Sequence, residues 1–122
     1  MKKIPFEFVI ENLFSMKPVI RPMFGCHAVY VGEKIMLILR SRIDHADDNG
    51  VWVATSHDHH ESLKKEFPNM RSVNLLNNGK RETAWRLIPA EADDFEMHVN
   101  NICELISKRD PRIGKIPNRK RK

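Results

Sequence analysis

The sequence predicts an α+β fold: a two-layer sandwich in which an antiparallel sheet of about five strands packs against helices at the N-terminus, middle and C-terminus. Apolar residues recur at helical spacing in the segments 4–15 and 90–107, and they alternate along short segments between these two. Turn residues such as Gly, Asn and Pro separate the segments. A chain of 122 residues suits one domain, which we expect over residues 1–107.

The first expected helix covers residues 4–15, where Pro5 suits a first helical turn and Pro18 stops the helix. Its apolar face consists of Phe6, Val9, Ile10, Leu13 and Phe14. Glu7 and Glu11 interrupt the apolar residues, which favours a helix of the mature protein over a signal peptide. No apolar run approaches the roughly 20 residues of a membrane span, so we expect a cytoplasmic protein.

Two strands are expected around Gly32-Glu33, because glycine in the first position of a two-residue loop suits a type II′ turn. Alternation places one set of side chains on a face that should meet the helices: Cys26, Ala28, Tyr30, Ile35, Leu37 and Leu39. The other face holds His27, Val29, Val31, Lys34, Met36 and Ile38. Cys26 and His27 then point in opposite directions, so this adjacent pair is not expected to be a reactive dyad.

The remaining elements follow from turn and capping signals. A third strand is expected over 51–56, and strands over 71–76 and 82–88 complete the sheet. A helix between the strands 51–56 and 71–76 has Asp58 as its N-cap and Glu61 three residues later, which fits a capping box. The last helix opens near Ala90 and carries an apolar stripe of Phe95, Val99, Ile102, Cys103 and Ile106.

Positive charge is concentrated at the end of the chain. Residues 108–122 contain eight basic residues and one acidic residue, a net charge of +7, whereas the whole chain carries +5. The preceding 107 residues therefore carry −2. The segment has two prolines and one glycine and little apolar surface to bury, so we expect a basic, disordered tail.

Several segments resemble known families. The stretches RPMFG (21–25) and AVYVGEKIMLIL (28–39) look like the opening of the TfoX N-terminal domain family, and WRLIPAE (85–91) resembles its aromatic strand before the last helix. The stretch LKKEFPNMRSVNLL (63–76) is similar to the related MmcQ/YjbR-like proteins. Together these matches cover roughly residues 4 to 107. The chain departs from the pattern at Cys26-His27, where the family often has a second glycine.

The resemblance implies a small two-layer domain with an antiparallel sheet. The TfoX group is associated with competence regulation and the YjbR-like group with proposed DNA binding, so the resemblance implies a bacterial domain in transcription regulation. It implies no catalytic site. From the residues themselves we likewise expect neither a catalytic constellation nor a cofactor, because no glycine-rich phosphate loop is present.

The leading expectation is that the chain is a small non-enzymatic regulatory or interaction domain, and that it contacts nucleic acid non-specifically through its tail. Charge neutralisation by the tail would release counterions from phosphates. The residues involved would be Lys108, Arg109, Arg112, Lys115, Arg119, Lys120, Arg121 and Lys122. A solubilising terminus without a specific contact is the competing interpretation of the same charges.

Two alternatives use other residues. A protein-binding module or homodimer would use the second hairpin face, with an interaction patch formed by His27, Val29, Val31, Met36 and Ile38. A metal-dependent enzyme would use the cluster His57, Asp58, His59 and His60, since zinc and nickel accept imidazole and carboxylate ligands. An exposed, polar helix start explains the same cluster, and we expect no native metal site.

Overall fold

The computed structural model describes residues 4–76 and 83–117 and contains a six-stranded antiparallel sheet in the order β1-β2-β3-β4-β6-β5. The α+β class is thus confirmed, with six strands where the sequence predicts about five. The strands are β1 (Val19–Met23), β2 (Cys26–Val31), β3 (Lys34–Arg40), β4 (Gly50–Val53), β5 (Arg71–Ser72) and β6 (Arg86–Pro89). The helices are α1 (Glu7–Asn12), α2 (His60–Glu66) and α3 (Phe95–Ser107).

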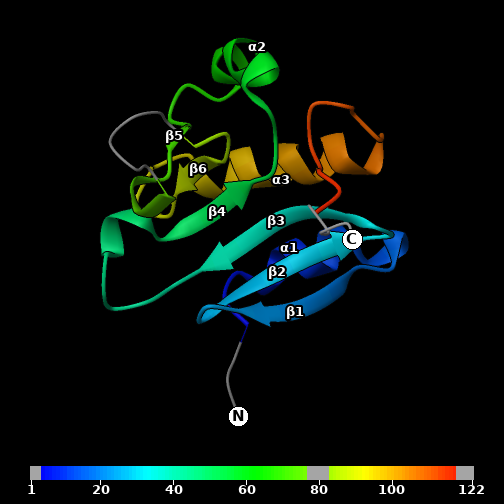
Figure 1. The fold of residues 1–122 in the computed structure, drawn as a ribbon, viewed down its shortest axis with the longest axis horizontal. Coiled ribbons are helices and arrows are strands. Elements are labelled where there is room, and N and C mark those ends of the chain that lie inside the picture. The colour runs from blue at the N-terminus through cyan, green and yellow to red at the C-terminus, as the bar shows by residue number, and fades with distance from the viewer. Residues whose placement is uncertain (1–3, 77–82, 118–122) are drawn as a thin grey trace, which may run out of the picture.

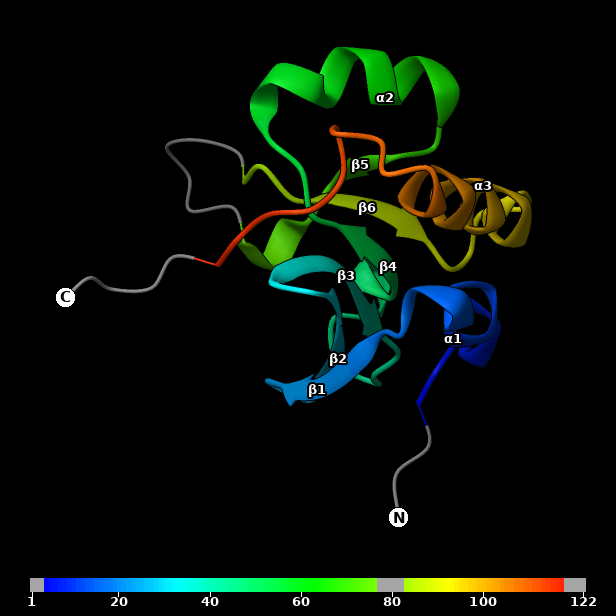
Figure 2. The ribbon, with the colours of Figure 1, turned by 90° about the vertical axis from the view of Figure 1, so that its right-hand side faces the viewer.

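The helices and the sheet form two layers. Helices α1 and α3 lie behind the sheet in Figure 1, and Figure 2 shows both on one side of it. The helix-side core between the layers includes Leu13, Val29, Leu37, Leu39, Val51, Val53, Leu63, Phe67, Ile88, Val99, Ile102 and Ile106. The predicted stripe of the last helix is fully confirmed, because Phe95, Val99, Ile102, Cys103 and Ile106 are all buried.

The opposite face of the sheet carries a second, smaller apolar cluster. This helix-free face consists of Cys26, Ala28, Tyr30, Ile35, Ile38, Trp52 and Leu87, and no helix in the described ranges covers it. Loops cover part of it instead, through side chains such as Val73 and Trp85. A sheet face that is apolar but has only loops over it is the first feature of functional interest.

The strand that the sequence does not predict is β1. It contains Pro22, which cannot donate a hydrogen bond to a neighbouring strand and is therefore confined to edge strands or strand starts. In the structure β1 is an edge strand that pairs only with β2, from Val19↔Tyr30 to Met23↔Cys26. The proline is compatible with this position because one side of β1 has no strand partner.

The predicted faces of the hairpin are wrong in two respects: Cys26, Ala28, Tyr30 and Ile35, which are expected to meet the helices, lie on the opposite face, and the predicted alternation fails at Met36. Val29 pairs with Leu37 and Tyr30 pairs with Ile35, so Met36 has no partner on β2 and forms a bulge. An extra residue shifts the alternation of every side chain after it. Leu37 and Leu39 consequently face the helices together with Val29, while Cys26, Ala28 and Tyr30 lie with Ile35 and Ile38 on the helix-free face.

The helix starts also differ from the prediction. Phe6 is left-handed, with φ 57°, so α1 begins only at Glu7. The capping box at Asp58 is absent: a 3₁₀ turn spans His57–His59, and neither it nor α2 has a side-chain cap. The acidic residues before α3 lie in turns, and the helix itself begins at Phe95. The type II′ turn is consistent with Gly32, whose φ is 62°.

Residues 109–117, here called the strap, pack back onto the sheet, where the sequence predicts a disordered tail from Lys108. Ile113 is buried in the helix-side core, and Lys115 pairs with Ile35 through backbone bonds of 2.8 and 3.0 Å. The Thr55 hydroxyl donates to the carbonyl of Arg112 at 2.6 Å. One buried apolar side chain and these backbone bonds outweigh the tendency of a charged segment to stay disordered. Residues 118–122 lie outside the described part of the chain.

Candidate functional site

Two adjoining hollows lie on the helix-free face, and we call them together the sheet groove. Their volumes are about 440 and 360 Å³. Both are lined by Met23, Phe24, Ile38, Trp52 and Leu76, and the larger one also by Tyr30, Ile35, Trp85, Lys115, Ile116 and Pro117. The groove therefore runs between the β1–β2 turn, the loop before β6 and the strap.

The β1–β2 turn places an aromatic side chain at the mouth of the groove. Met23 pairs with Cys26, which leaves Phe24 and Gly25 as a two-residue loop with φ values of 52° and 79°. Positive φ at both positions is the type I′ geometry, which favours Asn-Gly and is costly for a bulky residue. Phe24 is nonetheless there, and its side chain is 95% exposed.

Aromatic residues also form the floor and walls of the groove. Trp52 is buried and its indole N–H donates to the Asp48 carbonyl at 2.9 Å, so this ring is fixed. Tyr30 is half-buried, and the Arg21 guanidinium carbon lies 5.7 Å from the centre of its ring, a cation–π arrangement. Trp85 is half-buried on the opposite wall.

Arg42 lies beside the exposed phenylalanine because of a network centred on Arg40. The buried Arg40 guanidinium donates to the carbonyls of Asp44 and His45 and to the Asn49 side chain at 2.7–2.9 Å. The Asn49 side chain in turn accepts a hydrogen bond from the backbone N–H of Arg42 at 2.9 Å and donates one to the Arg42 carbonyl at 2.8 Å. The Arg42 guanidinium lies against Gly25, where a Cβ atom would collide with it.

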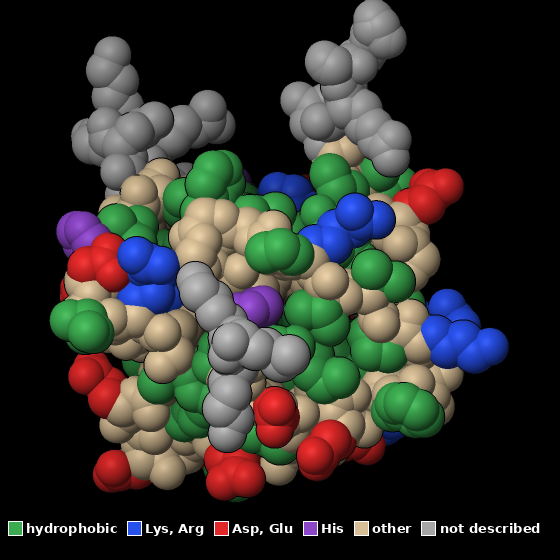
Figure 3. Space-filling model, turned by 90° about the horizontal axis from the view of Figure 1, so that it is seen from below, with side chains coloured by type: hydrophobic (Ala, Val, Ile, Leu, Met, Phe, Trp, Pro, Cys, Tyr) green, Lys and Arg blue, Asp and Glu red, His purple; other side chains and the backbone are tan. Residues whose placement is uncertain are grey.

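Charge is divided between the two sides of the molecule. Exposed acidic residues accompany α1 and α3: Glu7, Glu11, Glu91, Asp93, Glu96 and Glu104. Figure 3 shows most of its Asp and Glu side chains in the lower half, on the helix side, and others among the Lys and Arg side chains above them. The exposed Asp44 also lines the groove. Arg21, Arg42 and Lys115 surround the groove. An anionic partner would therefore be directed to the helix-free face.

The structure describes four of the predicted nucleic-acid-binding residues and does not bring them together on one surface. Lys108 lies 3.3 Å from Glu104, and Arg112 pairs with both Asp110 and Glu66 at 3.0 and 3.2 Å. Hydrogen bonds from Arg112 hold the pKa of Asp110 below its ordinary value, so Arg112 is neutralised locally. Lys115 lines the sheet groove, whereas Arg109 follows α3 elsewhere. The other four, Arg119, Lys120, Arg121 and Lys122, lie outside the described residues.

The predicted interaction patch does not form a surface. Val29 is fully buried under the helices, Met36 is buried beside it, and Val31 packs against the same core. Ile38 lies on the opposite face, and His27 is half-buried on the helix side. The patch fails for two reasons: the helices cover the face that holds Val29 and Val31, and the bulge at Met36 moves Ile38 to the opposite face, where the groove forms. The exposed apolar surface exists, but sequence reasoning placed it on the wrong residues.

The histidine cluster does not assemble a metal site. The rings of His57 and His60 lie 4.8 Å apart, and the Nε2 atom of His60 is 2.8 Å from the Ala84 carbonyl. Among the described residues, no three His, Cys, Asp or Glu side chains are placed to hold a metal ion. One of the two neighbouring rings is thus already engaged with backbone near β6.

Both cysteines are buried, and burial raises the pKa of each thiol. For Cys103 the pKa rises to about 11, so only about 0.1% is thiolate at pH 8. We expect the native protein to show no fast-reacting thiol toward a disulfide reagent at pH 8, and two after unfolding in guanidinium. One equivalent reacting quickly in the native state would contradict this.

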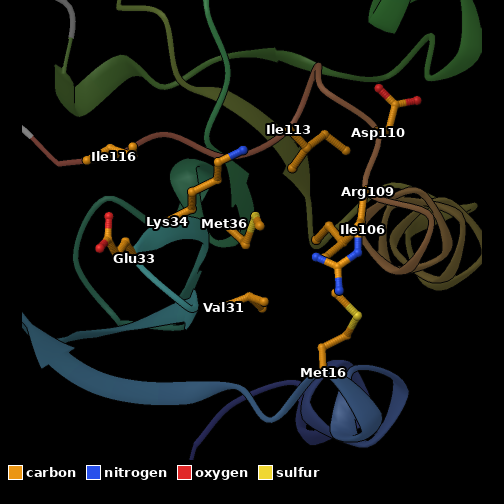
Figure 4. A pocket seen from close by; sticks show the side chains of 10 residues that line it. All are labelled: Met16, Val31, Glu33, Lys34, Met36, Ile106, Arg109, Asp110, Ile113 and Ile116. Atoms are coloured by element: carbon orange, nitrogen blue, oxygen red, sulfur yellow. The ribbon is translucent and has the colours of Figure 1, made fainter.

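A third hollow of about 390 Å³ lies on the other side of the strap, between α3 and the β2–β3 turn. Figure 4 shows Met36, Val31, Ile106 and Ile113 along it, with Lys34 and Arg109 on opposite sides. Arg109 takes the left-handed position after α3, with φ 62°. Glu33 and Asp110 lie at the same hollow, so its charge is mixed and selects no class of ligand.

The chain matches no protein family, no curated protein and no solved structure in comparisons with each. The resemblance seen in RPMFG and neighbouring segments therefore stays a prediction. Within the described ranges, no helix combines the length and apolar composition needed to cross a membrane.

Proposed function

We propose that this chain is a non-enzymatic regulatory domain that binds nucleic acid with its helix-free face. The supporting observation is the division of charge: acidic side chains accompany the helices, and cations surround an aromatic groove on the opposite side. Phosphates would be attracted to that side and repelled from the other. The resemblance to TfoX-type competence regulators agrees with a role in bacterial transcription regulation. We place this role in the cytoplasm, where both thiols would stay reduced.

Two segments of the chain that are basic in sequence adjoin groove-lining residues along the chain. Pro117 lines the groove and is followed in the sequence by Asn118 and the four basic residues 119–122. Lys80 and Arg81 lie in the sequence between Leu76 and Trp85, which both line the groove. Residues 77–82 and 118–122 are outside the described part, but each segment is joined to groove-lining residues. We therefore propose that the binding surface is the helix-free face, with the basic residues 80–81 and 119–122 contributing from segments joined to it in the sequence.

Charge removal at the C-terminus tests this function. Replacing Arg119, Lys120, Arg121 and Lys122 together by serine should reduce the slope of log affinity against log salt by about 3, because up to four phosphate contacts are lost. Fluorescence anisotropy with a labelled oligonucleotide of about 20 nucleotides, measured over a salt series, gives this slope. The melting temperature should stay the same.

The matched control keeps the charge: Arg119→Lys with Arg121→Lys should bind as the unchanged chain does. If the full chain binds neither single-stranded nor duplex DNA at low salt, the nucleic-acid function is wrong. If it binds and the serine variant binds equally well, the face binds nucleic acid without the terminal cations.

A second candidate is a homodimer or protein partner that covers the groove. The exposed apolar side chains Phe24, Leu75 and Leu76 favour it, because a soluble monomer rarely exposes such a group together. Sedimentation of the free protein distinguishes the two candidates. A stable dimer whose formation blocks oligonucleotide binding would favour the protein partner.

A further inference from the structure

We infer that the sheet groove takes single-stranded nucleic acid in preference to a duplex, with Phe24 as the platform on which an unpaired base stacks. This inference rests on the proposed function and assigns it a substrate class and a contact residue. Stacking needs a free base face, which a single strand offers and a duplex hides.

The inference depends on Phe24, because a phenylalanine is unfavourable at this position for two reasons. Its backbone is left-handed, with φ 52°, in a turn where asparagine fits without strain. Its ring is almost fully exposed and stacks on no aromatic ring of the described residues. Neither the folding of the turn nor the packing of the core explains a phenylalanine here. Strained residues of this kind cluster at ligand-binding positions.

The surroundings of Phe24 supply the other parts of a single-strand site. The groove beside it is mostly apolar and has Tyr30 and Trp85 on its walls, so a second base has an aromatic surface to contact. Arg42 lies against the neighbouring Gly25, and Arg21 lies over the Tyr30 ring. The Arg21 guanidinium is thus over an aromatic ring, and the Arg42 guanidinium lies against the turn that carries Phe24 and lines the same hollow. Both can reach a backbone phosphate that follows a stacked base.

The nearby acidic groups offset the charge of Arg42 but leave Arg21 and Lys115 without an ion pair to a described residue. Asp44 accepts a hydrogen bond from Arg42 at 2.9 Å, which lowers the pKa of Asp44 and offsets one charge. Asp48 is buried and accepts from the backbone N–H groups of Asn74 and Leu75. Arg21 and Lys115 therefore remain available to phosphate oxygens.

The test compares an oligothymidylate of about 12 nucleotides with a duplex of the same length, both fluorescently labelled, near physiological salt. We expect the full chain to bind the single strand about tenfold more tightly than the duplex. Phe24→Asn should lower the affinity for the single strand about tenfold and leave the duplex affinity unchanged. Its melting temperature should not fall, since Asn-Gly suits a type I′ turn.

Phe14→Asn is the matched control. Phe14 is also an exposed phenylalanine, at 77%, but it lies outside the groove, so its replacement should leave the binding of both probes unchanged. Equal affinity for the two probes, or single-strand binding that survives Phe24→Asn, would overturn the inference while the nucleic-acid function stands. The inference would also be wrong if the protein is a dimer that dissociates in Phe24→Asn while oligonucleotide binding stays the same. The groove would then be the binding site of a second copy of the chain. Binding of neither probe would instead overturn the proposed function.

Discussion

Replacing Ile113 with alanine is expected to lower the free energy of unfolding by about 3 kcal/mol. Ile113 is only 2% exposed and fills the helix-side core from the strap, so alanine leaves a cavity among well-packed neighbours. The same side chain is the apolar anchor that holds residues 109–117 against the sheet. Urea unfolding followed by circular dichroism measures the loss.

Ile116 provides the matched control because it is the same residue type in the same strap but is 59% exposed. Ile116→Ala should cost less than about 1 kcal/mol, since little surface is removed from water on folding. The deletion of residues 109–122 should behave like Ile113→Ala and lower the melting temperature. If the truncated protein melts at the same temperature as the full chain, the strap does not stabilise the fold. That result would agree with the disordered tail predicted from the sequence.

The periodic parts of the fold can be predicted from the sequence. The stripe of α3 keeps one spacing over 13 residues, and the Gly32 turn marks the β2–β3 hairpin. The bulge at Met36 cannot be predicted in this way, because Lys34 to Arg40 reads as one regular strand and nothing in it marks an extra residue. A single unpaired residue then reverses the faces that alternation assigns.

The site was missed for a related reason. Nothing in the RPMFG stretch indicates that Phe24 is exposed, because its exposure depends on β1, and Pro22 makes this segment look unlike a strand. One signal was available: a phenylalanine directly before glycine, between two segments that can pair, is an unusual type I′ turn. Composition predicts a disordered strap, since its two isoleucines among many charged residues give no periodic pattern, yet Ile113 is buried in the core.

Arg40→Lys is the second substitution with a large expected effect: it should lower the free energy of unfolding by about 2–3 kcal/mol. The Arg40 guanidinium is 2% exposed and its two terminal nitrogens reach three acceptors, on Asp44, His45 and Asn49, at 2.7–2.9 Å. A lysine ammonium is a single point that cannot span these positions. At least one buried acceptor then loses its partner, which costs more than a surface hydrogen bond contributes.

The effect should extend to nucleic-acid binding, because Asn49 links Arg40 to the backbone of Arg42 beside the groove. We expect Arg40→Lys to weaken oligonucleotide binding and to speed amide hydrogen exchange in residues 41–49, even though the charge is kept. Arg42→Lys is the control: this side chain is exposed, so its replacement should change stability by less than about 0.5 kcal/mol. Equal unfolding free energies for the two variants would show that the buried guanidinium network does not hold this loop. Faster exchange in Arg40→Lys alone would show that a residue inside the fold positions the cation at the groove.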